Sequence, residues 1–170
     1  MNSSEKRKLL FSHINSCKQN GRLSLEKSFF QHGTCSVYKH SVSVALESIS
    51  IADRLGVHVD YKSLVRGALL HDYFLYDWHT HKNKIPFTHG FTHPFTALKN
   101  AKEDFNLSRR EIDIITHHMF PLIPLPPLTK EGWIVCLADK LCAVHETVKR
   151  KKKRHERVKA KLRSKKTPSR

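Results

Sequence analysis

The stretch Gly67-Ala-Leu-Leu-His71-Asp72 is a short apolar run that ends in an imidazole and a carboxylate. Neighbouring positions on a helix are about 100° apart, so His71 and Asp72 can hold one metal ion between them. Because the preceding residues are apolar, we expect the Asp72 carboxylate to be buried and to need a cation, a donor or a metal as its partner. A His-Asp pair also occurs at surface turns, so the remaining ligands must be found elsewhere in the chain.

Apolar residues predict two helices that lead into this stretch. In the first helix they recur at three- and four-residue steps from Val42 to Leu55, and Gly56 is a typical stop signal. His40 stands at the start of this helix. The second helix has Asp60 as its expected N-cap and runs directly into His71.

The segment after Asp72 predicts a loop, two helices and a connector. Periodicity is lost over residues 73–90, where we expect a loop near the site. Thr92-His93-Pro94 predicts the start of a helix, with Pro94 in its first turn. The capping box Ser108-x-x-Glu111 predicts a helix that reaches His118. The proline-rich residues 121–128 exclude a helix and suit a stiff connector.

A last core helix is expected after Thr129, which is its expected cap. Asp139 stands alone among the apolar residues of this helix, and a lone carboxylate in that setting requires a partner. The apolar residues are Trp133, Ile134, Leu137, Ala138, Leu141 and Val144. Because no stretch of any length alternates as a strand would, the predicted fold class is all-α.

Length and composition predict one helical bundle with an extension at each end. A chain of 170 residues with 39% hydrophobic content can bury a core. We expect a helical lead-in at 1–30, the bundle at 31–148 and a basic tail at 149–170. Leu9-Leu10-Phe11 is too short for a signal peptide, and no stretch resembles a transmembrane segment. These features predict a cytoplasmic protein.

The positive charge of the chain is concentrated in its tail. Residues 149–170 carry +12 of the net +16. Such charge runs are typical of solvated, partly helical or disordered extensions. The charge would nevertheless allow contact with RNA, ribosomes or anionic lipid.

Four residues from separate predicted helices form a candidate metal site: His40, His71, Asp72 and Asp139. Two imidazoles and two carboxylates suit manganese, iron, cobalt or zinc better than magnesium. His71 follows His40 by 31 residues, and Asp139 follows Asp72 by 67 residues. This order in an all-helical chain resembles the HD-domain superfamily of metal-dependent phosphohydrolases over about residues 31–148. The segments QHGTCSVYKH, HGFTHP, HHMFPL and CLADK are most similar to a group of small bacterial HD proteins of unassigned substrate.

The resemblance implies one or two divalent transition metal ions. In two-metal members additional histidines lie between the His-Asp pair and the final Asp, where this chain has His93 and His118. We therefore expect His40, His71, Asp72 and Asp139 to bind the first ion. The second ion would be bound by His93 and His118. Asp72 would bridge the two ions and is the expected catalytic residue.

The chain also departs from the family pattern. Many members continue the pair as His-Asp-x-x-Lys, whereas here Tyr73 to Tyr76 supply no lysine. Lys140 or Arg66 could provide the positive charge that contacts a phosphate.

Two more histidines are candidates for contact with the substrate. His89 could orient the substrate or a metal ligand, and it could equally be a loop residue bonded to backbone. His117 is 100° from His118 on a helix and could point away from the site.

The resemblance implies a hydrolase that acts on a nucleotide or related phosphate ester through a metal-bound hydroxide. A mononucleotide, a dinucleoside polyphosphate and a cyclic dinucleotide all remain open. Two other functions are alternatives to this hydrolase. One is an HD-type oxygenase with a two-iron site, and the other is a non-catalytic module that binds nucleic acid through the basic tail.

Overall fold

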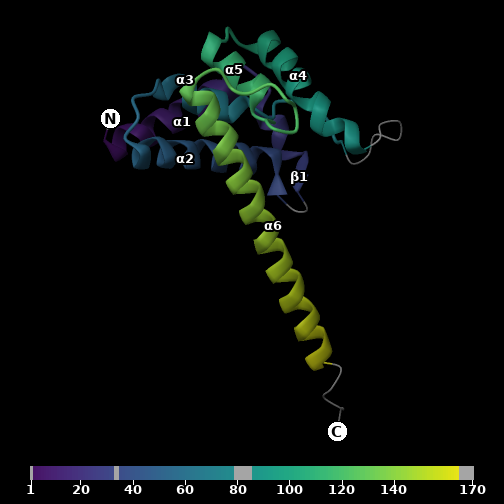
Figure 1. Ribbon diagram of the computed structural model, residues 1–170. Coiled ribbons are helices and arrows are strands. Elements are labelled where there is room, and N and C mark those ends of the chain that lie inside the picture. The colour runs from purple at the N-terminus through teal and green to yellow at the C-terminus, as the bar shows by residue number, and fades with distance from the viewer. Residues whose placement is uncertain (1, 33–34, 79–85, 165–170) are drawn as a thin grey trace.

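Helices build nearly all of the fold, and the predicted all-α class is confirmed (Figure 1). The structure is a computed structural model that describes residues 2–32, 35–78 and 86–164. The helices are α1 (Ser3–Gln19), α2 (Val37–Leu55), α3 (Tyr61–Leu70), α4 (Pro86–Asp104), α5 (Arg109–His117) and α6 (Lys130–Ser164), with a 3₁₀ helix η1 (Leu23–Lys27). Strands β1 (Phe30–His32) and β2 (Cys35–Ser36) pair antiparallel. Among the described residues, no helix has the length and apolar character needed to cross a membrane.

Local capping interactions place the end of α2 and the starts of α3 and α5 where the sequence predicted them. The Asp60 carboxylate accepts hydrogen bonds from two backbone amides in the first turn of α3. Ser108 and Glu111 form a capping box at the start of α5. Gly56 ends α2 with φ of 61°, a left-handed conformation that glycine adopts without steric cost. These interactions form between residues close in sequence, which is why the sequence revealed them.

Helix α3 occupies the centre of the bundle, in contact with α1, α2, α5 and α6. Its side chains Leu64, Val65, Ala68 and Leu69 are fully buried in the main core cluster. The apolar run therefore delivers His71 and Asp72 into the interior, where both are buried. The predicted lead-in also belongs to this core, because Leu10 and Ile14 of α1 pack in the same cluster.

The predicted start of α4 is wrong. The helix begins at Pro86 and contains Pro94 in its interior, so the predicted loop at 73–90 is shorter. Residues 79–85 of that loop lie outside the described residues. The first position of a helix tolerates proline such as Pro86, because a backbone N–H there would have no partner within the helix. Pro94 removes one internal hydrogen bond of the helix. Ala97 and Ala101 beyond it are nevertheless fully buried in a second core cluster, which also contains Leu70 and Tyr73, and this packing holds the helix in place.

Helix α6 does not stop where the predicted core helix gives way to the tail. It is one continuous helix of 35 residues, roughly 50 Å long, that leaves the bundle and projects from it (Figure 1). Its predicted apolar face is only partly in the core: Ile134 and Ala138 are buried, whereas Trp133 and Leu137 are each 48% exposed. The bundle covers one side of α6, and the sequence pattern could not distinguish that side from the uncovered one.

Candidate metal centre

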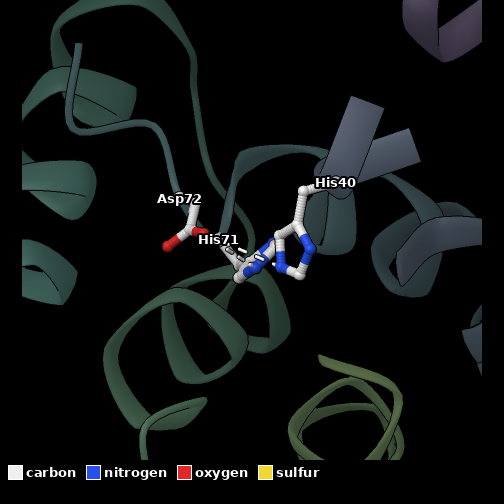
Figure 2. A group of neighbouring side chains, drawn as sticks. All are labelled: His40, His71 and Asp72. Carbon is white, nitrogen blue, oxygen red and sulfur yellow. Dashed lines mark ion pairs between the residues drawn. The ribbon is translucent and has the colours of Figure 1, made fainter. Parts of the chain in front are cut away.

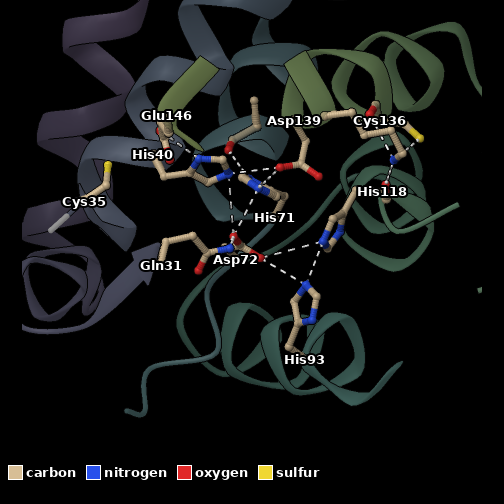
Figure 3. Close-up of polar contacts among 12 residues, drawn as sticks. Gln31, Cys35, His40, His71, Asp72, His93, His118, Cys136, Asp139 and Glu146 are labelled. Atoms are coloured by element: carbon tan, nitrogen blue, oxygen red, sulfur yellow. Dashed lines mark hydrogen bonds and ion pairs between the residues drawn. The ribbon is translucent and has the colours of Figure 1, made fainter. Parts of the chain in front are cut away.

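Six side chains from five elements converge in the interior of the bundle (Figure 3). Five of them are buried, and the side chain of Asp139 is 14% exposed. The sequence placed them at a helix start, at helix ends and on an otherwise apolar face. They are His40 (α2), His71 and Asp72 (end of α3), His93 (α4), His118 (end of α5) and Asp139 (α6).

The first group of donor atoms comes from His40, His71 and Asp72 (Figure 2). The Oδ2 atom of Asp72 lies 3.4 Å from Nε2 of His71 and 3.9 Å from Nε2 of His40. Asp139 adjoins this group from α6, with its Oδ1 atom 3.0 Å from Nε2 of His40 and 3.8 Å from Nε2 of His71. Two imidazoles and two carboxylates therefore meet at one point.

The second group is formed by Asp72, His93 and His118. The Oδ1 atom of Asp72 lies 3.2 Å from Nε2 of His93 and 3.7 Å from Nε2 of His118. The two imidazole Nε2 atoms are 2.9 Å apart. Asp72 thus presents one carboxylate oxygen to each group.

Backbone carbonyls fix the orientation of three of these imidazoles. In each of them Nδ1 lies beside a carbonyl oxygen about one turn earlier in the chain, at 2.8 Å for His71 and 2.9 Å for His93 and His118. A carbonyl only accepts, so Nδ1 carries the proton and donates it. In the neutral ring Nε2 then holds a lone pair, which is the form that binds a metal.

This arrangement fits a divalent cation. Within the described part of the chain, Nε2 of His71 and Oδ1 of Asp72 are buried and make no hydrogen bond. The lone pairs of His93 and His118 face each other, an arrangement that a cation between them would stabilise. Imidazole and carboxylate donors suit manganese, iron, cobalt or zinc. All six donors can therefore be satisfied by metal binding.

The electrostatics of the site keep its carboxylates ionised. Burial acts to raise the pKa of Asp139, but the hydrogen bond from His40 and the charges of nearby imidazoles lower it to about 2. Burial and the charges of His71 and His93 lower the pKa of His118 to about 3. At neutral pH these groups are anionic and neutral respectively, as metal ligands must be.

Glu146 supports His40 and was missed by the sequence analysis. Its Oε1 atom lies 3.1 Å from Nδ1 of His40, on the opposite side of the ring from Asp139. Burial acts to lower the pKa of His40, but the hydrogen bonds to Asp139 and Glu146 raise it to about 10, so a metal ion that binds Nε2 would have to displace a proton from this ring. A carboxylate behind a ligating histidine fixes the ring and increases its basicity. The sequence did hold a signal, because Glu146 is two helical turns after Asp139 and shares its face.

Gln31 was also missed by the sequence analysis. It comes from β1, and its Nε2 atom donates to Oδ2 of Asp72 at 2.6 Å. No periodicity links Gln31 to Asp72, which is 41 residues later. The short hairpin therefore adds a donor that holds the shared carboxylate.

A cavity of about 400 Å³ opens onto the shared Asp72 and onto Asp139, His93 and His118. Its wall includes Trp78, whose ring stacks on that of His89 with centroids 4.8 Å apart and planes 8° from parallel. Apolar side chains and Lys140 complete the wall. The lining includes Asp72, His93, His118, Asp139, Met119 and Leu122.

Two of the four predicted substrate contacts lie at this cavity. Lys140 lines it, with Nζ donating to the His118 carbonyl at 2.9 Å. His89 lines it too, and its Nδ1 atom lies 2.9 Å from the Tyr76 hydroxyl oxygen.

The structure does not bring Arg66 or His117 to the cavity. The Arg66 guanidinium makes a bidentate pair with Glu111 of α5, at 2.5 and 2.7 Å. Nδ1 of His117 lies 2.6 Å from Asp113, a carboxylate that also accepts from the backbone amide of Thr129. Both side chains therefore have structural partners, and neither lines the cavity.

The chain was compared with known families and proteins. A family model described as "HD domain" matches residues 37–144, well over half of the chain. Searches of curated proteins and of solved structures gave no match. The matched segment contains all six converging residues and excludes Gln31 and Glu146.

Proposed function

Because this chain belongs to the HD-domain superfamily of metal-dependent phosphohydrolases, we propose that it hydrolyses the phosphate ester of a nucleotide or a related small molecule. One observation carries this proposal: two groups of donor atoms share Asp72, and this carboxylate lines one cavity together with Asp139, His93 and His118. In this proposal His40, His71, Asp72 and Asp139 would hold the first ion. Asp72, His93 and His118 would hold the second ion.

Each protein group has a distinct part in the proposed reaction. A divalent metal, when bound, supplies a water of lowered pKa and positive charge opposite the phosphoryl oxygens. Asp72 is the shared ligand, and Gln31 holds its carboxylate in place by donating to Oδ2. The carbonyl-bound imidazoles keep their lone pairs directed inward. Lys140 supplies a cation at the cavity wall, where it favours an anionic substrate.

The shape of the cavity favours a small substrate. About 400 Å³ is near the lower end of the range for ligand sites, which favours a mononucleotide over a dinucleoside polyphosphate or a cyclic dinucleotide. Trp78 and the apolar wall suit a flat, weakly polar base, while the phosphate would face the metal ligands.

The test is phosphate release from a panel of nucleoside monophosphates with Mn²⁺ added. We expect Asp72→Ala to lose bound metal and at least about 10³-fold in kcat, since both ions and the water they activate depend on this carboxylate. Circular dichroism should show an unchanged helical content. Asp53→Ala is the matched control, because Asp53 pairs with Lys6 outside the cavity. Hydrolysis by Asp72→Ala at the parent rate would exclude the proposal.

The same ligands also suit a two-iron oxygenase, because iron accepts imidazole and carboxylate donors. Purification without oxygen separates the two functions. Iron in the protein with consumption of O₂, and no phosphate release with Mn²⁺, would favour the oxygenase.

We also propose that residues 149–170 contact RNA or another polyanion. The proposed location of the protein is the cytoplasm. Support comes from the charge of +12 and from the exposure of Lys149, Arg150 and Arg154 on α6. Such binding should weaken steeply with salt, because neutralised phosphates release counterions. A purely nucleic-acid-binding role would leave the buried donors of the cavity without a purpose.

A further inference from the structure

One side of α6 carries a long apolar stripe that the described elements leave about half exposed. The stripe consists of Trp133, Leu137, Leu141, Val144 and Val148, which are 46–63% exposed. Steps of three and four residues place them within an arc of about 80°. In Figure 1 this helix leaves the bundle, so the far end of the stripe lies beyond the other helices.

An apolar hollow extends the stripe onto a second element. It has a volume of about 340 Å³ and is lined by Leu55 at the end of α2 together with Trp133 and Leu137. Leu55 is itself 62% exposed. The apolar surface therefore spans two helices, which is more than the scattered single side chains of an ordinary surface.

Beyond Val148 the same side of α6 becomes basic. Lys151, Lys152 and Lys159 are exposed there, and the helical repeat places them within about 100° of Trp133. The face thus has an apolar half near the bundle and a cationic half near its tip. A partner has to match both halves.

A second copy of the chain matches them poorly. In a parallel pair of α6 helices the lysines of the two tips would lie opposite each other. In an antiparallel pair that overlaps along the whole face, Lys159 would lie opposite Trp133 and Lys151 opposite Leu141. An antiparallel pair that overlaps only along the stripes would leave the lysines of both tips without an anionic partner. Nucleic acid would satisfy the lysines and leave the apolar half in water.

We propose that this face of α6 binds the surface of an anionic membrane, a peripheral contact that goes beyond the proposed hydrolysis. Apolar side chains would enter the boundary between head groups and acyl chains, as in other interfacial amphipathic helices. The lysines would lie at the lipid phosphates, and Trp133 is of the residue type enriched at this depth. This assigns anionic lipid as the polyanion that the basic tail contacts.

The test is sedimentation of the full-length protein with phosphatidylcholine vesicles, with and without phosphatidylserine. We expect the protein to bind the phosphatidylserine vesicles. Binding to vesicles without phosphatidylserine should be at least about tenfold weaker. Leu141→Glu with Val144→Glu should weaken binding by at least about tenfold, and so should Lys151→Glu with Lys152→Glu. The matched control is Leu46→Glu, since Leu46 is 49% exposed on α2 and lies outside the stripe.

A spectroscopic measurement checks which side chains enter the lipid. Trp133 emission, recorded in a Trp78→Phe background, should shift to shorter wavelength when the phosphatidylserine vesicles are added. Binding that Leu141→Glu with Val144→Glu leaves unchanged would overturn the proposal. So would RNA binding or self-association without vesicle binding, which would assign the face to nucleic acid or to a second copy.

Discussion

Glu26 is a fully buried carboxyl group on η1 that the proposed metal ligands do not include. Within the described residues, neither of its oxygens makes a hydrogen bond. Burial and the negative charge of Asp72 raise the pKa of Glu26 well above its ordinary value. The folded protein therefore holds Glu26 in its neutral form at a pH where the unfolded chain ionises it.

Glu26→Gln should stabilise the protein at neutral pH. Above the unfolded pKa the folded state binds more protons than the unfolded state, so the free energy of unfolding falls as pH rises. Glutamine removes this loss. Between the unfolded and folded pKa values, the free energy of unfolding of the variant should therefore exceed that of the parent by about 1.4 kcal/mol for each pH unit above the unfolded pKa. Urea unfolding from pH 4 to pH 7 measures the difference.

The control for this prediction is Glu156→Gln, because Glu156 is exposed on α6. It should change stability by a similar small amount at every pH. A stability difference between the parent and Glu26→Gln that does not vary with pH would show that Glu26 is ionised in the folded protein.

At the scale of the helix, the end of α2 depends on one backbone conformation. Gly56 has φ of 61°, and apart from its adjacent residues and the nearby helix backbone no described atom lies within 4 Å of the position that a Cβ atom would occupy. A side chain there would meet no steric obstacle from neighbours, so its effect would come from the backbone alone.

Gly56→Ala should lower the free energy of unfolding by about 1 kcal/mol, because an L-residue is strained in the left-handed region. Gly56→Asn should lose less, since asparagine tolerates this conformation better. The midpoint of urea unfolding measures both. Ser43→Ala, at an exposed position of the same helix, should be nearly neutral. Equal stability of the glycine, asparagine and alanine proteins would contradict this account.

The whole molecule is built around anionic and lone-pair donors in its interior. Asp72, Asp139 and the inward-facing imidazoles bring together helices α2 to α6. A ligand that binds only this folded arrangement stabilises the entire bundle by mass action.

Metal removal should therefore lower the melting temperature of the whole protein. A metal at 1,000 times its dissociation constant contributes about 4 kcal/mol. For a chain of this size that corresponds to a shift on the order of 10 °C. Differential scanning calorimetry with Mn²⁺ and with a chelator measures the shift. Asp72→Ala should show no such difference, whereas a parent protein that melts identically in both conditions would argue against a metal in the core.

The sequence alone determined the helix ends that carry local caps and the residue types of the candidate site. Caps such as Asp60 and the Ser108–Glu111 box are made between near neighbours, so they can be read locally. His71 and Asp72 were recognisable because an apolar run ended in two donor groups. Asp139 stood out as a lone carboxylate among apolar residues, and His40 stood at a helix start. The family resemblance added His93 and His118, and the fold brings all six together.

Only the tertiary structure decided which side of each element faces a neighbour. It brought Gln31 and Glu146 to the donor groups and turned Arg66 and His117 toward carboxylates elsewhere. It also left half of the α6 face exposed. Periodicity shows that a helix has an apolar side, but burial of that side depends on helices distant in sequence, whose packing no local pattern encodes.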